Sequence, residues 1–158
     1  MPIRCEIVSQ DRLVWEGDVD IVILPGTDGE MGVLPNHAPV LTTLKFGFIK
    51  VRTHGIEQVF AVAGGVAEVQ PYIVTVLADA AENVEEIDVA RAEVAKERAE
   101  KLLEQGPPPD MNAALAIDAA LRRSNLRLDA VRRYRRVGRA QISKAVVPPM
   151  DASSPEGE

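Results

Sequence analysis

Side chains that could do chemistry are sparse in the first half of the chain. The glycine-rich stretch from Pro25 to Pro39 carries Asp28, Glu30 and His37, and its three glycines stand three residues apart. That spacing is neither a dinucleotide fingerprint nor a P-loop. His37 has no second histidine or cysteine at ligand spacing. Acidic residues in glycine loops commonly stabilise turns, so we expect no phosphate cradle, metal site or catalytic carboxylate pair here.

The remaining reactive groups are also expected to be structural. Cys5 alternates with Ile3 and Ile7, which predicts a small buried side chain and not a nucleophile. A single cysteine excludes an internal disulfide framework and fits a reducing compartment. His54, beside a glycine, is expected to be a solvated turn residue. Because no nucleophile, base and oxyanion donor come together, we do not expect an enzyme.

The second half carries a run of positive charge. Eight arginines and one aspartate lie between Arg122 and Arg139. Such a run could mark a nucleic-acid-binding helix, with an affinity that falls steeply as salt rises. Tyr134 is the only aromatic residue in the run, however, and the protein as a whole is acidic. An acidic protein partner explains the arginines equally well, so the residues alone leave both interpretations open.

Charge divides the chain into two regions. The net charge of −6 combines −8 over residues 1–86, +5 over residues 87–147 and −3 over the last eleven residues. Apolar residues make up 46% of the sequence, yet no apolar run approaches the roughly 18 residues that span a bilayer. The N-terminus lacks the apolar segment of a signal peptide. We therefore expect a cytosolic chain that meets a membrane only through a partner.

Short alternating segments dominate the residues before position 85. Turn signals recur every eight to twelve residues, which is typical of a β-sandwich or barrel. Between two of these strands, Pro25–Pro39 is expected to form a shaped loop with a short strand through Val33 and Leu34 and a corner at residues 35–37. The predicted strands are 3–8, 13–15, 19–24, 40–44, 48–52, 58–63, 66–69 and 73–77.

Two amphipathic helices are predicted after residue 85. Asp88 is placed to cap the first helix, and Gly106 with the following three prolines ends it. Asp110 is placed to cap the second, whose apolar positions step by three and four from Ala114 to Val131. The two helices should form an antiparallel hairpin. Its many alanines bury little area each, so the hairpin should be able to detach. The residues from Val147 onward have the composition of a disordered tail.

Several motifs in a fixed order resemble the epsilon subunit of bacterial F-type ATP synthases. They are Gly-Glu-x-Gly-x-Leu-Pro-x-His-Ala-Pro at residues 29–39, Gly-Gly-Val-Ala-Glu-Val at 64–69 and Ile-Asp-Val-Ala-Arg-Ala at 87–92. The resemblance covers residues 3 to about 136. It implies an α+β fold, with an antiparallel β-sandwich of about ten strands at residues 1–84 and an α-helical hairpin at residues 87–140. Residues 141–158 are expected to be a disordered tail. Its acidic residues, and the extra arginines up to Arg139, depart from the family pattern.

The resemblance also implies a function. Members of this family are non-catalytic rotor subunits that bridge the gamma shaft and the membrane c-ring, and their hairpin can extend to an acidic loop of a beta subunit and block ATP hydrolysis. We therefore expect a peripheral subunit at the cytoplasmic face of the bacterial cell membrane, without a nucleic-acid partner. Glu30, Met31 and His37 would face gamma or the ring. The residues that would meet the beta loop are Arg122, Arg123, Arg127, Arg132, Arg133, Arg135 and Arg136.

A regulatory nucleotide is a further implication. No cofactor is required, but in some bacterial relatives the folded hairpin binds ATP and stays retracted. The matching residues here are Asp88 and Arg91, together with Arg123 and Arg127, and further candidates are Glu82 and Arg98. The alternative is purely structural: Asp88 caps a helix and Arg91 forms a salt bridge between the helices.

Overall fold

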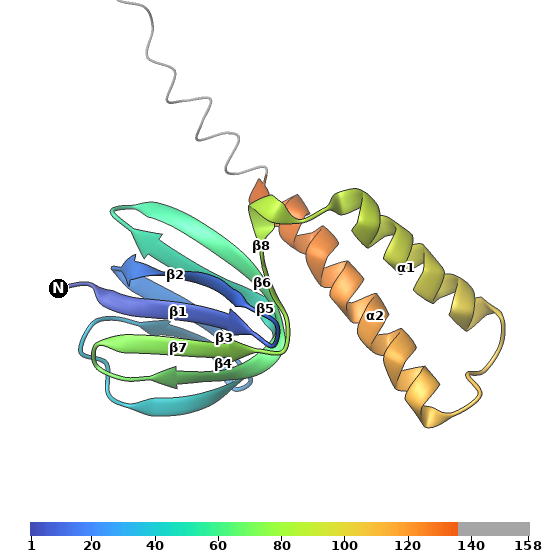
Figure 1. Ribbon diagram of the computed structural model, residues 1–158, viewed down its shortest axis with the longest axis horizontal. Coiled ribbons are helices and arrows are strands. Elements are labelled where there is room, and N and C mark those ends of the chain that lie inside the picture. The colour runs from blue at the N-terminus through green and yellow to red at the C-terminus, as the bar shows by residue number, and fades with distance from the viewer. Residues whose placement is uncertain (136–158) are drawn as a thin grey trace, which may run out of the picture.

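The computed structural model describes residues 1–135 as a β-sandwich followed by a helical hairpin (Figure 1). This architecture confirms the α+β fold class expected from the sequence. The strands are β1 (Ile3–Ser9), β2 (Leu13–Val19), β3 (Ile21–Gly26), β4 (Gly29–Val33), β5 (Val40–Thr53), β6 (Ile56–Val69), β7 (Ile73–Ala78) and β8 (Ala81–Asn83). They are followed by the 3₁₀ turn η1 (Val84–Glu86), the helices α1 (Val89–Glu104) and α2 (Met111–Ala130), and the π-helix η2 (Val131–Arg135).

The strands form one continuous hydrogen-bonded sheet that folds over on itself. Its order is β2-β1-β7-β6-β5-β3-β4, with β8 paired to β6. All pairs are antiparallel except β1 with β7. Inward-facing residues of these strands close a single apolar core, which includes Ile3, Ile7, Leu24, Ile49 and Phe60, all fully buried. This core contains no residue of the helices, so the sandwich has its own interior.

The structure has eight strands in the described part of the chain, fewer than the ten expected. The four segments predicted between residues 40 and 69 are two long strands, β5 and β6. The register is the same on both sides of the predicted break, with Leu44 opposite Gly65 and Phe46 opposite Ala63. Gly64 and Gly65 take φ values of +87° and +126°, which lets β6 curve without ending. At this point β6 changes its partner from β8 to β7.

The stretch Pro25–Pro39 is more regular than the sequence suggested. The first half is a hairpin: Gly26 pairs with Gly29 across a two-residue turn, and β4 continues to Val33. Leu34, predicted within a strand, lies just outside it. The predicted corner is present, because Asn36 takes a positive φ of 64° and its N–H donates to the Pro71 carbonyl at 2.8 Å. The loop prediction was wrong for residues 29–32, since glycine at position 29 permits a tight hairpin turn.

Both helix caps are as predicted. The Asp88 carboxylate accepts a hydrogen bond from the Arg91 N–H at 3.0 Å, and the Asp110 carboxylate accepts one from the Ala113 N–H at 2.8 Å. Gly106, with a φ of +111°, follows the end of α1. Between the helices the contact is made by small side chains, with Ala92 and Ala99 of α1 and Ser124 of α2 buried. No helix within residues 1–135 is long and apolar enough to cross a membrane.

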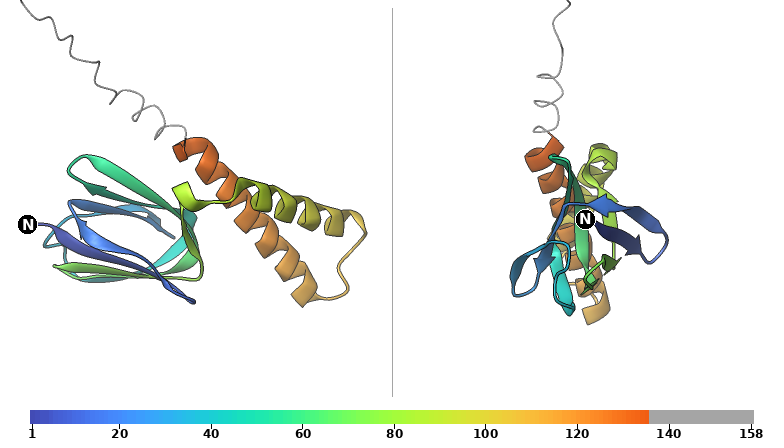
Figure 2. Two further views of the ribbon diagram at one scale, coloured as in Figure 1. Left: turned by 45° about the horizontal axis from the view of Figure 1, so that its top comes forward. Right: turned by 90° about the vertical axis from the view of Figure 1, so that its left-hand side faces the viewer.

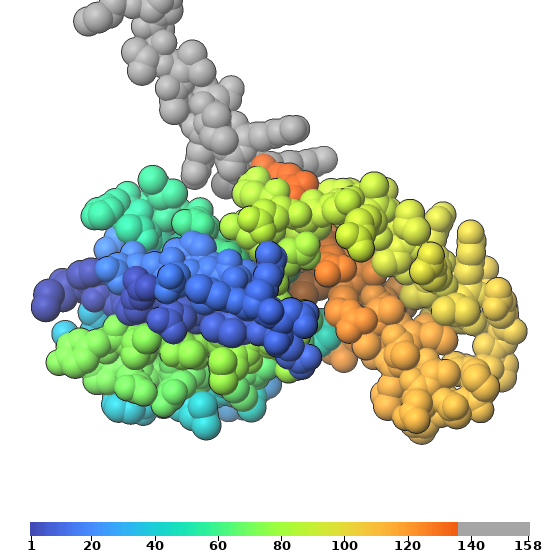
Figure 3. Space-filling model, in the orientation of Figure 1, coloured from blue at the N-terminus to red at the C-terminus, as the bar shows by residue number. Residues whose placement is uncertain are grey.

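The hairpin rests on the sandwich through the C-terminal end of α2. A second apolar cluster forms there, with Ala61, Val84, Ile87 and Ala130 buried and with Phe48, Val59, Leu126, Val131 and Tyr134 partly buried around them. The opposite end of the hairpin projects away from the strands (Figures 1 and 2). In the space-filling view the hairpin is a separate lobe beside the sandwich (Figure 3). The joint between the two parts is therefore much smaller than the sandwich core.

Candidate functional site

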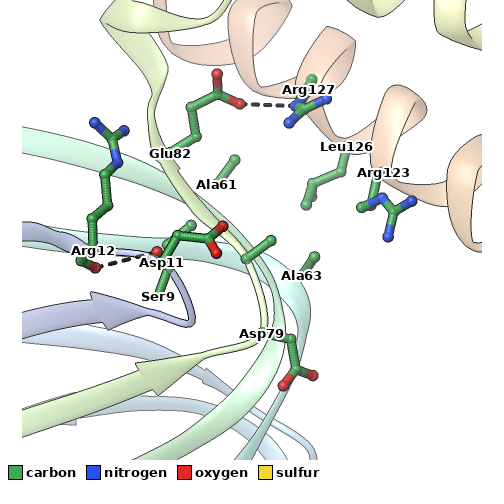
Figure 4. Close-up of a pocket in the computed structure, with 12 residues that line it drawn as sticks. Ser9, Asp11, Arg12, Ala61, Ala63, Asp79, Glu82, Arg123, Leu126 and Arg127 are labelled. Atoms are coloured by element: carbon green, nitrogen blue, oxygen red, sulfur yellow. Dashed lines mark hydrogen bonds and ion pairs between the residues drawn. The ribbon is translucent and has the colours of Figure 1, made fainter.

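A cleft of about 230 Å³ lies between the sandwich and α2 (Figure 4). Alanines from β6 and the segment before β8 line its sandwich side, and charged side chains from three separate elements surround it. Its lining residues are Ser9 at the end of β1, Asp11 and Arg12 from the β1–β2 turn, Ala61 and Ala63 from β6, Asp79 to Glu82, and Arg123, Leu126 and Arg127 from α2.

The charges around this cleft are mixed. Asp11, Asp79 and Glu82 contribute carboxylates from the sandwich, while Arg123 and Arg127 contribute guanidinium groups from the helix. One ion pair crosses it: the Arg127 Nε donates to the Glu82 carboxylate at 2.8 Å (Figure 4). Within residues 1–135, Arg123 forms no ion pair. The cleft can therefore present Arg123 to an anion. It can present Arg127 as well once the ion pair between Arg127 and Glu82 is broken.

The six candidate nucleotide residues fall into two groups. Glu82, Arg123 and Arg127 share the cleft at the sandwich. Asp88, Arg91 and Arg98 instead line an open hollow of about 430 Å³ along α1, which no strand residue borders. The capping role of Asp88 is confirmed. The interhelical salt bridge suggested for Arg91 is not formed with any residue that the structure describes.

Most of the arginines expected to meet a beta subunit contact groups within this chain. Arg122 lies over the Phe46 ring, with 4.6 Å between the guanidinium carbon and the ring centre. Arg132 and Arg133 both pair with Asp129 of the same helix. Arg135 donates to the backbone carbonyls of Val84 and Ile87, at 2.7 and 2.8 Å. Arg136 lies outside the described residues. The side chains of Arg122, Arg132 and Arg133 nevertheless remain 59–73% exposed, so much of the basic surface still faces solvent in this conformation.

The residues expected at the gamma or ring contact lie on β4 and the corner after it. Glu30 forms an ion pair with Lys50 at 3.7 Å, and Met31 packs against the sandwich core. His37 Nδ1 lies 2.7 Å from the Ala38 carbonyl oxygen. Within residues 1–135 no three histidine, cysteine or acidic side chains gather as a metal site would require. Glu30 is exposed at this position, while Met31 and His37 are half-buried.

Near this corner lie exposed apolar side chains that were not predicted from the sequence. Leu34, Leu41 and Tyr72 are 57%, 72% and 74% exposed. The hydrogen bond from Asn36 to Pro71 and the pairing of β5 with β6 hold the corner beside the β6–β7 turn. We call Leu34, Leu41 and Tyr72 the corner patch. Gathered exposed apolar side chains are typical of interaction sites. The sequence signal was weak: Leu34 and Tyr72 stand beside prolines, whereas Leu41 lies inside a predicted strand, where alternation alone does not show which face is covered.

The single cysteine is not a reactive centre. Cys5 is fully buried in the sandwich core, as predicted from its alternation with Ile3 and Ile7. Burial raises the pKa of its thiol to about 12, because a thiolate would lose its hydration there. The thiol is therefore protonated at neutral pH and unavailable as a nucleophile.

Comparison with known families accounts for nearly all of the described chain. Residues 2–84 match the family model for the ATP synthase delta/epsilon chain, beta-sandwich domain. Residues 85–132 match the model for the long alpha-helix domain of the same chain. The chain belongs to the ATP synthase delta/epsilon family. This confirms the resemblance drawn from the motifs at residues 29–39, 64–69 and 87–92.

Individual relatives within the delta/epsilon family agree. An ATP synthase epsilon chain of Dehalococcoides mccartyi is 43% identical over 134 residues, which cover 85% of this chain and 95% of that protein. An epsilon chain of Pelotomaculum thermopropionicum is 52% identical over 100 residues, covering 63% of this chain and 75% of that protein. The alignments therefore span nearly the whole length of the first relative and most of the second.

Solved structures show the same fold. A chain in the mitochondrial ATP synthase of Euglena gracilis, described as OSCP, F1 and c-ring in one rotational state, aligns with a TM-score of 0.67 at 25% identity. The alignment covers 82% of this chain and 81% of that one. A chain in the central stalk and c-ring of the Tetrahymena thermophila enzyme aligns with a TM-score of 0.53 at 14% identity, covering 82% and 96%. The second likeness concerns the fold alone.

Proposed function

We propose that this chain is a non-catalytic central-stalk subunit of a bacterial F-type ATP synthase, where it joins the gamma shaft to the membrane c-ring. The observation that carries the proposal is the match of both domains, in order, to one family whose curated relatives are named ATP synthase epsilon chain. The Euglena chain, which belongs to an F1 and c-ring assembly, adds support. The subunit would be peripheral, at the cytoplasmic face of the membrane, and held there by its partners.

The corner patch, with Glu30, Met31 and His37 beside it, is the surface that we assign to these rotor partners. Leu34, Leu41 and Tyr72 provide apolar area that folding leaves uncovered. Residues 1–86 carry an excess of acidic side chains, and this charge favours partner surfaces with basic groups at the rim. The apolar centre would supply most of the binding free energy.

A pull-down with the gamma subunit tests this assignment. The variant Leu41→Asp should reduce the amount of gamma that co-purifies by about tenfold or more, because a carboxylate would be buried without a partner. Leu13→Asp is the matched control: Leu13 is also half exposed, but it pairs with Val8 near the end of β1, whereas Tyr72 accepts a hydrogen bond from Arg4 near the start of that strand. Equal recovery of gamma with both variants and the parent chain would refute the assigned surface.

The basic face of α2 and η2 is proposed to regulate ATP hydrolysis. When the hairpin extends, Arg122, Arg123, Arg127 and the arginines of η2 would meet an acidic loop of a beta subunit. Arginine pairs with carboxylates in bidentate fashion, which suits such a loop. The present contacts of Arg127 with Glu82 and of Arg135 with backbone carbonyls must break first. The retracted hairpin would therefore be the non-inhibiting form.

ATP is proposed as a regulatory ligand that favours the retracted form. Arg123 and Arg127 could bind its phosphates at the cleft, while Arg91 and Arg98 extend the positive charge along α1. The cleft volume of about 230 Å³ is below the 300–1,000 Å³ usual for small-molecule sites. A whole nucleotide would therefore need Arg127 to leave Glu82 and the cleft to widen.

Calorimetric titration of the isolated protein with ATP tests the ligand proposal. Arg123→Ala and Arg91→Ala should each weaken binding by roughly tenfold or more, the usual loss for one charge-assisted hydrogen bond. A loss with Arg123→Ala alone would restrict the site to the cleft at the sandwich. Absence of measurable heat with the parent protein at millimolar ATP would retire the ligand proposal and leave the rotor assignment intact.

A further inference from the structure

The outward face of β5 receives the end of the helical hairpin. Every second residue of this strand, from Phe46 through Phe48 to Lys50, faces away from the core. Ile49, between the last two, is buried in the core. Phe46 carries the Arg122 guanidinium. Phe48 meets the Tyr134 ring edge-on, with 5.0 Å between ring centres and 67° between ring planes. Lys50 Nζ lies 5.8 Å from the centre of the same tyrosine ring.

The end of α2 is shaped to make these contacts. From Val131 to Arg135 the helix widens into a π-helix, a form that is rare and frequently marks a functional position. Within this one turn, Tyr134 reaches β5 while Arg135 reaches the opposite side of the joint. There Arg135 donates to the carbonyls of Val84 and Ile87. Both residues lie within the short segment that connects β8 to α1.

Arg135 thus holds residues 84–87 in place. This segment must change its conformation if the hairpin moves relative to the sandwich. Val84 and Ile87 are themselves buried in the small cluster between sandwich and hairpin. One guanidinium therefore ties the end of the second helix to the beginning of the first. Its Nε is buried, and no described residue accepts a hydrogen bond from it.

We propose that Phe48, Tyr134 and Arg135 form a latch that keeps the hairpin retracted on the sandwich. The aromatic pair fixes the end of α2 to β5, and Arg135 fixes the same turn to residues 84–87. Opening requires both contacts to break together, because they come from adjacent residues of one π-turn. The proposal deepens the regulatory role proposed above and rests on it for its biological meaning. The latch itself is a property of the isolated chain.

Hydrogen exchange of the full-length protein, read by mass spectrometry, tests the latch. Tyr134→Ala and Phe48→Ala should each speed exchange of the amides of residues 84–88 and 131–135 by about fivefold to tenfold, as expected when an aromatic pair is lost. Exchange in β1 and β7 should stay as slow as in the parent chain, because the sandwich core does not include either ring. Tyr134→Phe keeps the ring and should exchange as the parent does.

Matched controls separate the latch from a general loss of stability. Arg135→Ala should open the same segments, whereas Arg132→Ala removes the same charge from the same turn but pairs only within the helix, with Asp129. Tyr72→Ala removes an exposed ring from the β6–β7 turn, outside the cluster that joins the hairpin to the sandwich. The latch is overturned if Tyr134→Ala exchanges like the parent, or if Arg132→Ala and Tyr72→Ala speed exchange as much as Tyr134→Ala and Arg135→Ala do.

The outcome is distinguishable from failure of the proposed regulation. Faster exchange in Tyr134→Ala with unchanged inhibition of ATP hydrolysis in the assembled enzyme would support the latch and refute the inhibitory role of the hairpin. Slow exchange in that variant, combined with altered inhibition, would refute the latch and leave the inhibitory role standing.

Discussion

At the scale of single residues, the arginines of α2 and η2 hold the retracted hairpin through many weak contacts. The Arg127–Glu82 pair is partly exposed, and pairs of that kind contribute about 0–1 kcal/mol. Arg122 over Phe46 adds a cation–π contact of similar size. An acidic partner would therefore compete with contacts that are weak one by one, although those made by the η2 turn must break together. The sequence predicted the caps because they are local, but not the Glu82–Arg127 contact, which joins residues 45 positions apart.

Asp88 allows its structural and ligand-binding roles to be separated. Asp88→Ala should lower the free energy of unfolding of the hairpin by about 1 kcal/mol, because the Arg91 N–H loses its acceptor. Asp88→Asn should be nearly neutral, since asparagine caps equally well. Asp110→Ala, which removes the matching cap of α2, is the control for a loss of helix stability. Thermal unfolding followed by far-ultraviolet circular dichroism measures all three.

A stability loss in Asp88→Asn as large as in Asp88→Ala would show that the Asp88 carboxylate has a role in the fold beyond capping. Weaker ATP binding in Asp88→Asn, without a stability loss, would instead show that the negative charge of the Asp88 carboxylate takes part in binding the ligand.

Among the secondary-structure elements, the alternation of apolar residues predicted the sandwich. It did not predict that β5 and β6 would each be one long strand. Glycine pairs usually end a strand in a sequence pattern, whereas Gly64 and Gly65 lie inside β6. Only the partner strands show why: β6 exchanges β8 for β7 at this point, and the chain must curve closely past Leu77 and Ala78. Such pairing over long sequence distance cannot be read from one local window. The hairpin was predictable because its caps and breakers lie beside the helices they bound.

Gly65 should therefore tolerate no side chain. A Cβ at this position would stand 2.3 Å from the Leu77 carbonyl oxygen and 2.8 Å from the Ala78 Cα, at a φ of +126°. Gly65→Ala should reduce the free energy of unfolding by at least about 2 kcal/mol, from strain and overpacking together. Urea unfolding followed by Trp15 fluorescence measures the loss.

Gly32→Ala is the control for that measurement. Its added Cβ would meet only the end of the Ile21 side chain, at 3.8 Å, so we expect a change within about 0.5 kcal/mol. Equal stability of the Gly65→Ala and Gly32→Ala variants would contradict the close backbone approach at β6.

At the scale of the whole molecule, the sequence predicted an acidic sandwich and a basic hairpin but not how they meet. The structure shows that the C-terminal end of α2 makes the joint, through a cluster of few buried residues beside a sandwich core that needs none of them. The proposed choice between a docked and an extended hairpin would depend on small differences between weak tertiary contacts. Periodicity and charge cannot express those differences. A sandwich with its own core, joined to a basic hairpin by a small apolar cluster, is the arrangement that the proposed regulation by movement requires.

The rate of ATP hydrolysis by the assembled F1 complex is the decisive measurement for the proposed movement of the hairpin. Complexes are prepared with the full chain and with a chain lacking residues 88–158, which retains the entire sandwich core. If the hairpin is an inhibitory lever, the truncated chain should still co-purify with gamma while hydrolysis becomes faster than with the full chain. A truncated complex that binds gamma normally but hydrolyses ATP at the same rate as the full-length complex would contradict the central claim.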